Sequence, residues 1–160
     1  MKRLALLSVI LIATCVVAMA QPRAIGGRLT NGVGVSYQHG FGESNMLQVD
    51  VDFPVFGLQA AVTYNWIFPI SSWSHAGEWN WYAGVGGGAG YYWGWWGTWG
   101  SSAFVGVAGM IGVEYTFNFP LQLSLDYRPV FGPSFEADYI GFHVLGCWSG
   151  AIGLGVRYKF

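Results

Sequence analysis

Eight charged residues lie at alternate positions of otherwise apolar segments, and together they could form a network of ion pairs. They are Arg28, Asp50, Asp52, Glu114, Asp126, Arg128, Arg157 and Lys159. Because successive side chains of a β-strand point to opposite faces, these residues would share one face with polar and small neighbours. Four are basic and four are acidic. Exposed ion pairs contribute only about 0–1 kcal/mol, whereas breaking a buried pair costs about 3–5 kcal/mol, so the balance favours a buried network.

Residues that could form another kind of site are few. His39, His75 and His143 each lie at a predicted turn or loop, and none has a second ligand at a spacing typical of a metal site. Ser74, His75 and Glu78 are the one group that could serve nucleophilic catalysis, and such combinations arise often by chance. We therefore expect no metal site, no cofactor and no enzyme.

Glycine dominates residues 84–90, which read Gly-Val-Gly-Gly-Gly-Ala-Gly. A phosphate-binding loop would follow a strand, open a helix and carry a lysine. Here the alternation continues through the segment, and glycine in a strand marks a sharp bend or a close approach of other groups. The run therefore predicts a strand.

The elements that would position these residues are strands separated by turn signals. The predicted strands are 23–30, 33–38, 46–53, 58–68, 78–93, 103–117, 121–131 and 150–160. Asn31-Gly32 is a strong signal for a hairpin between the first two. Alternatively, residues 23–38 form one strand and residues 139–147 supply the eighth, which would reverse the direction of most loops. We prefer the hairpin, because it puts the tight turn 118–120 at the end where transmembrane barrels have short turns.

Alternation also separates an apolar face from a polar one along each strand. Two explanations exist: a soluble barrel such as a lipocalin with water outside, or a membrane barrel with lipid outside and a polar interior. Only 9% of residues are charged, against about 25% in an ordinary soluble domain, and the 18% that are aromatic lie mostly near predicted strand ends. Both facts favour an all-β fold, an eight-stranded antiparallel transmembrane β-barrel with aromatic rings at the lipid–water boundaries.

The first twenty residues are typical of a cleavable export signal. Lys2 and Arg3 supply the positive start, residues 4–17 a short apolar stretch, and residues 18–20 (Ala-Met-Ala) a cleavage site. The predicted organisation is a signal peptide at 1–20 and a single barrel domain at 21–160.

Two cysteines bear on this organisation. Cys15 could mark a lipoprotein signal, but Thr14 before it is larger than the residue found in sequences that resemble such signals. The mature chain would keep Cys147 alone, which excludes an internal disulfide. It would also keep five basic against eight acidic residues, so we expect no nucleic-acid partner, which would need a basic patch.

The end of the chain carries a resemblance to a known family. With the export signal, residues 153–160 (Gly-Leu-Gly-Val-Arg-Tyr-Lys-Phe) resemble the small outer-membrane β-barrel proteins of Gram-negative bacteria, of the OmpA/OmpX-like class, and most of all the compact barrels of Bacteroidota. The resemblance implies that Val156, Tyr158 and Phe160 form the signal read by the barrel-assembly machinery. It also implies a location in the outer membrane, in contact with its lipid, and it is weak on activity.

We expect a plugged polar interior, because eight strands enclose a space just wide enough for their own side chains. The role would be structural or interaction-based, through the loops near 92–102 and 132–149. Trp95, Trp96 and Trp99 could contact an extracellular glycan, lipid or protein, or could only extend the aromatic boundary. A small pore is the alternative function, and an enzyme that modifies outer-membrane lipids is the second alternative.

Overall fold

A computed structural model describes residues 21–73, 76–93, 101–136, 140–145 and 151–160, and these residues are almost entirely β-strand. The strands are β1 (Gln21–Leu29), β2 (Gly32–Gly40), β3 (Asn45–Pro54), β4 (Gly57–Pro69), β5 (Gly77–Tyr92), β6 (Ser102–Phe117), β7 (Leu121–Tyr127), β8 (Val130–Glu136), β9 (Ile140–Leu145) and β10 (Ile152–Lys159). A single 3-10 turn, η1 (Ser71–Trp73), lies between β4 and β5.

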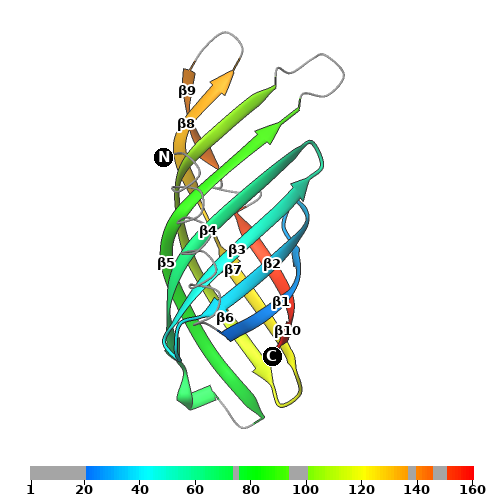
Figure 1. The fold of residues 1–160 in the computed structure, drawn as a ribbon, viewed down its shortest axis with the longest axis vertical. Helices are drawn as coiled ribbons and strands as arrows, with labels where there is room; N and C mark the ends of the chain where they lie inside the picture. The colour runs from blue at the N-terminus through cyan, green and yellow to red at the C-terminus, as the bar shows by residue number, and fades with distance from the viewer. Residues whose placement is uncertain (1–20, 74–75, 94–100, 137–139, 146–150) are drawn as a thin grey trace, which may run out of the picture.

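The strands form one antiparallel sheet that closes on itself into a barrel (Figure 1). Strands β1 to β6 are neighbours in chain order, β6 pairs with both β7 and β8, and β10 pairs with β7 and β1. β7 and β8 are two segments of one strand, interrupted at Arg128 and Pro129, and β9 and β10 together occupy the last position. The barrel therefore has eight antiparallel strand positions, so the predicted fold class is confirmed as a closed eight-stranded barrel.

The first two strands form a hairpin. β1 and β2 are joined by a tight turn at Thr30 and Asn31, and Leu29 lies opposite Val33. The preferred prediction is confirmed, and the alternative of a single strand over residues 23–38 is wrong.

The segment after Phe131 differs from the prediction of a long connection over residues 132–149. Part of it is the hairpin of β8 and β9. Gly132 and Pro133 resemble turn residues, but the outward apolar positions continue from Phe131 to Phe135 and extend the strand. The ladder between β6 and β8 skips Gly132 and Pro133, which is how a strand inside a sheet accommodates a proline that has no N–H to donate.

Both ends of the described chain lie at the same end of the barrel, which we name the termini end; there Ala24 pairs with Lys159 (Figure 1). The turns 41–44 and 118–120 and the connection containing η1 lie at this end as well. The opposite end, named the loop end, carries the turns between β1 and β2 and between β3 and β4. The wall is uneven, because β5 and β6 have 16 residues each and β1 and β2 only nine each, so β5, β6, β8 and β9 stand higher at the loop end.

Candidate functional site

The barrel has a polar inside and an apolar outside. The buried polar side chains on the inner face include Arg28, Ser36, Gln38, Gln48, Asp50, Asp52, Gln59, Thr63, Asn65, Glu114, Gln122, Ser124, Asp126, Arg128 and Arg157. Large apolar side chains on the other face are open to the surroundings, for example Val33 at 61%, Val107 at 64% and Ile152 at 55% exposure. The candidate site is therefore the lumen, where charged groups have been taken away from solvent.

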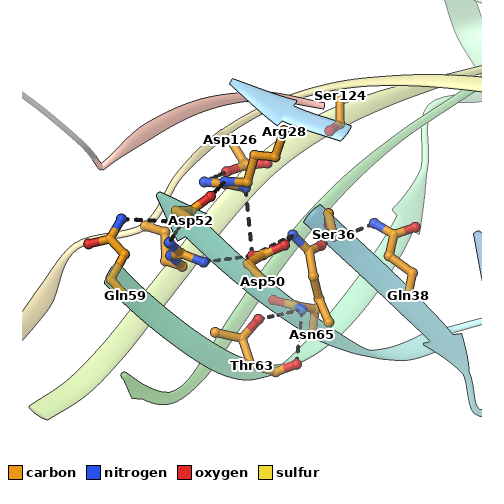
Figure 2. Close-up of polar contacts among 12 residues, drawn as sticks. Arg28, Ser36, Gln38, Asp50, Asp52, Gln59, Thr63, Asn65, Ser124 and Asp126 are labelled. Carbon is orange, nitrogen blue, oxygen red and sulfur yellow. Dashed lines mark hydrogen bonds and ion pairs between the residues drawn. The ribbon is translucent and has the colours of Figure 1, made fainter. Parts of the chain in front are cut away.

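Two arginines and three aspartates form the centre of the lumen (Figure 2). Arg28 on β1 lies 2.5 Å from Asp126 on β7, and 3.7 and 3.6 Å from Asp50 and Asp52 on β3. Arg128, between β7 and β8, contacts Asp50 at 2.7 Å and also pairs with Asp52. All five side chains are at most 2% exposed. This central ion cluster ties the β1–β3 wall to the wall that contains β7.

Neutral side chains add hydrogen bonds to each of these carboxylates. Gln48 donates to both oxygens of Asp50 at 3.1 and 3.0 Å, and Gln59 donates to Asp52 at 3.2 Å. The hydroxyl of Tyr82 donates to Asp126 at 3.2 Å. A buried charge is tolerated when it is both paired and hydrogen-bonded, and these aspartates meet that condition.

Arg157 lies in the lumen but has hydroxyl partners instead of a carboxylate. Its Nε donates to Ser36 at 2.9 Å and its Nη1 donates to Ser124 at 2.6 Å. Among the described residues no carboxylate lies within 4.0 Å of this guanidinium. It bridges β10, β2 and β7.

Glu114 pairs with Arg23, a residue that the sequence analysis did not include in the network. Arg23 reaches across the lumen from β1 to β6, pairs with both oxygens of Glu114 and also donates to Gln38 at 2.9 Å. By alternation Arg23 belongs to the outer face with Ile25. A β-bulge shifts the register between Pro22 and Ala24 and turns Arg23 inward. Pro22 is the one sequence signal beside this bulge, since proline within a sheet is found at strand starts, edges and bulges, and the sequence analysis did not use it.

Lys159 lies apart from the other seven predicted residues. Its Nζ is 3.4 Å from Glu78 at the termini end, and the two side chains are 30% and 72% exposed. Lys159 is the second-last residue, and β10 ends there, so its side chain reaches the rim of the barrel and not the packed lumen.

The buried charges nevertheless balance once Arg23 takes the place of Lys159. The cations are Arg23, Arg28, Arg128 and Arg157, and the anions are Asp50, Asp52, Glu114 and Asp126. Three buried arginines and the partly buried Arg23 match four buried carboxylates, so the lumen is neutral, which lowers the cost of holding the charges in a narrow space.

Glycines on the inner face make room for the long side chains. A Cβ at Gly153 would collide with the guanidinium of Arg28, and a Cβ at Gly155 would collide with Ser124 and Arg157. Gly112 similarly leaves space for the ring of Tyr82. The glycine-rich run 84–90 is part of the continuous strand β5, as predicted, and does not form a loop before a helix.

Two apolar clusters occupy the lumen beside the ions. Met46, Ile67, Tyr82 and Met110 form one, all at most 6% exposed. Phe104, Ala108 and Val130 form the other, and Tyr92 packs against them. The lumen is therefore filled by the barrel's own side chains at two levels.

The outer face carries aromatic rings in contact with one another near the termini end. Contacts with centroid distances of 4.7 to 6.2 Å join Tyr37, His39, Phe41, Tyr64 and Trp66 in one row, and Trp79, Tyr115, Phe117 and Phe119 in another. The predicted assembly residues Val156, Tyr158 and Phe160 lie on the outer face at 44%, 54% and 67% exposure.

The remaining candidate residues are only partly described by the structure. His39 is buried on the outer face beside Tyr37, and His143 belongs to β9. Ser74 and His75, and likewise Trp95, Trp96 and Trp99, lie outside the described residues. Within the part of the chain that the structure describes, no three His, Cys, Asp or Glu residues could hold a metal ion, and no helix is long and apolar enough to cross a membrane.

Comparisons of the chain with protein-family models, with curated proteins and with solved structures find no significant match. The class of protein is therefore defined by the structure alone, as a closed eight-stranded antiparallel β-barrel with an ion-paired lumen.

Proposed function

We propose that this chain is an integral outer-membrane β-barrel protein with a plugged interior, which serves a structural or interaction role and does not conduct solutes. The observation that carries the proposal is the distribution of side chains: buried arginines and aspartates inside, and a band of exposed valine, leucine, isoleucine and aromatic residues outside. A soluble barrel would expose the charges and bury the apolar residues, whereas a membrane barrel alternates apolar-out with polar-in.

Three further features support the outer membrane. The sequence of residues 1–20 is typical of an export signal, and Val156, Tyr158 and Phe160 present the alternating apolar ending that the resemblance implies for the assembly machinery. The aromatic rows near the termini end match a lipid–water boundary. In the proposed orientation the termini end faces the periplasm, and the loop end, where β5, β6, β8 and β9 stand higher, faces outward.

Electrophoresis with and without boiling tests the membrane barrel. A folded outer-membrane barrel keeps its structure in unheated SDS and migrates differently from the boiled chain, so membrane fractions of expressing cells should show a heat-dependent shift. A band that appears only in the soluble fraction, without a shift, would refute the proposal.

Conductance in planar bilayers separates a plugged barrel from the small pore. The two apolar clusters and the central ion cluster fill the lumen, so we expect no channel steps from the purified protein. Reproducible steps from purified protein would favour the pore. An unchanged lipid A profile on expression would in turn exclude the lipid-modifying enzyme.

A further inference from the structure

The termini end of the barrel opens into two adjoining hollows of about 920 and 330 Å³, and Glu78, Lys159 and Phe160 line both. We propose that this mouth binds a free α-amino acid. Its ammonium and carboxylate groups would lie at the junction of the hollows and its side chain in the larger one. This binding site is independent of the proposed membrane role, because its groups belong to the barrel itself.

The floor of the larger hollow is already saturated and neutral. Arg23 lines this hollow and pairs with the buried Glu114, which also accepts from Asn80 at 3.3 Å and from Gln122 at 3.1 Å. Arg23 also donates to Gln38 at 2.9 Å and to the sulfur of Met46 at 3.2 Å. A ligand must therefore be recognised by the groups that lie nearer the opening.

The junction of the hollows holds a cation and an anion side by side. The Nζ of Lys159 lies 3.4 Å from Glu78, and this single contact leaves hydrogen atoms of the ammonium group free to donate. Because the pair is open to solvent, with 72% of the Glu78 side chain exposed, it adds little stability of its own. Ligand groups of opposite charge can therefore replace either partner.

Thr116 supplies an independent sign of a ligand. It is 5% exposed and lines the smaller hollow, and its Oγ1 has no hydrogen-bond partner among the described residues. Thr116 lies directly opposite Glu78 in the β5–β6 ladder. Most buried hydroxyls have a partner, so an unpartnered one in the same hollow as Lys159 suits an incoming acceptor.

These three groups match the head of an α-amino acid. Its carboxylate would accept from Lys159 and Thr116, and its ammonium, on the same carbon, would donate to Glu78. The larger hollow offers Ile67, Pro69 and Ile70 to an apolar side chain, while Glu43 at its edge disfavours an acidic one. The mouth therefore suits a leucine-like zwitterion better than a simple anion or amine.

The test uses the isotope-labelled barrel in octyl glucoside micelles, since an uncharged detergent does not compete for the charges. L-leucine, L-leucinamide and 4-methylpentanoate are titrated in separate NMR experiments. We expect L-leucine to give saturable shifts at Thr116 and Lys159. Each analogue lacks one charged group and should bind at least roughly tenfold more weakly, as expected for the loss of a charge-assisted hydrogen bond. No saturable binding of L-leucine, or equal affinities for all three, overturns the proposal.

Four variants assign the effect to the named groups. Thr116→Val and Glu78→Gln should weaken L-leucine binding roughly tenfold or more, Thr116→Ser should keep it, and Glu136→Gln at the loop end should not change it. Each variant is first checked for the heat-dependent gel shift. If Thr116→Val does not fold, Glu78→Gln is the variant that tests the site, and Thr116→Ser is the control expected to bind normally. Unchanged binding in Glu78→Gln contradicts the site, and the result does not depend on whether the barrel lies in a membrane.

Discussion

Individual residues in the lumen are held by partners that come from distant parts of the sequence. Arg128 pairs with Asp50 and Asp52, which lie 78 and 76 residues earlier. Arg28 shares both of these aspartates, so the cluster has no redundant cation. Removing one guanidinium group leaves a buried carboxylate without a full counter-charge. Such an uncompensated charge strongly destabilises a low-dielectric interior.

We predict that Arg128→Met lowers the free energy of unfolding by about 3–5 kcal/mol, because Asp50 and Asp52 then share Arg28 alone. Urea titration of the barrel in lipid vesicles measures the change. Lys159→Met is the control, since its exposed pair with Glu78 is worth about 0–1 kcal/mol. Equal effects of the two substitutions would show that the lumen charges are as well solvated as those at the rim.

Glycine positions offer a second test at this scale. Gly153→Ala should destabilise the barrel by about 1–3 kcal/mol, because the added methyl group meets the guanidinium of Arg28. Gly27→Ala adds the same group on the outer face, where the nearest heavy atom is 4.0 Å away, and should leave the unfolding midpoint nearly unchanged. The prediction fails if the two midpoints shift together.

At the scale of elements, strict alternation made most strands and their faces predictable. It failed where the backbone departs from a regular strand. The bulge beside Pro22 turns Arg23 inward, and a proline alone does not tell at which residue the alternation shifts. Lys159 has the correct parity but lies at the end of β10, at the rim of the barrel. Gly132 and Pro133 are typical of a turn, yet they continue a strand. The strand tolerates them because the β6–β8 ladder skips both residues.

The orientation of the barrel in the membrane, with the hairpin turns of one end outside the cell, is also testable. In a Cys147→Ser background, Asn31→Cys at the loop end should react with a membrane-impermeant maleimide on intact cells. Asn118→Cys at the termini end should react only after the outer membrane is opened. Both side chains are exposed, so access to the reagent depends on which side of the membrane each turn occupies. Reversed labelling would place the termini end outside the cell.

At the scale of the whole molecule, the closed ring and the balanced lumen belong together. Closure of the ring around β1 and β10 brings Arg28, Arg128 and their aspartates into one space. Neutrality of that space allows the outer face to be apolar with few exposed charges. The sequence could predict which residues share the inner face, but not the pairing partners, because these depend on the shear of strands far apart in the chain.

The central claim is that the apolar face meets lipid, and a nitroxide on that face tests it most directly. The label is attached at Val107→Cys, which points outward from the middle of β6, and at Asn118→Cys as the aqueous reference, both in the Cys147→Ser background with the barrel in lipid vesicles. We predict that dissolved oxygen speeds the relaxation of the label at residue 107, whereas a water-soluble nickel complex has little effect on it. The nickel complex should speed the relaxation of the label at residue 118. Strong nickel access at residue 107 in the folded barrel would contradict the account.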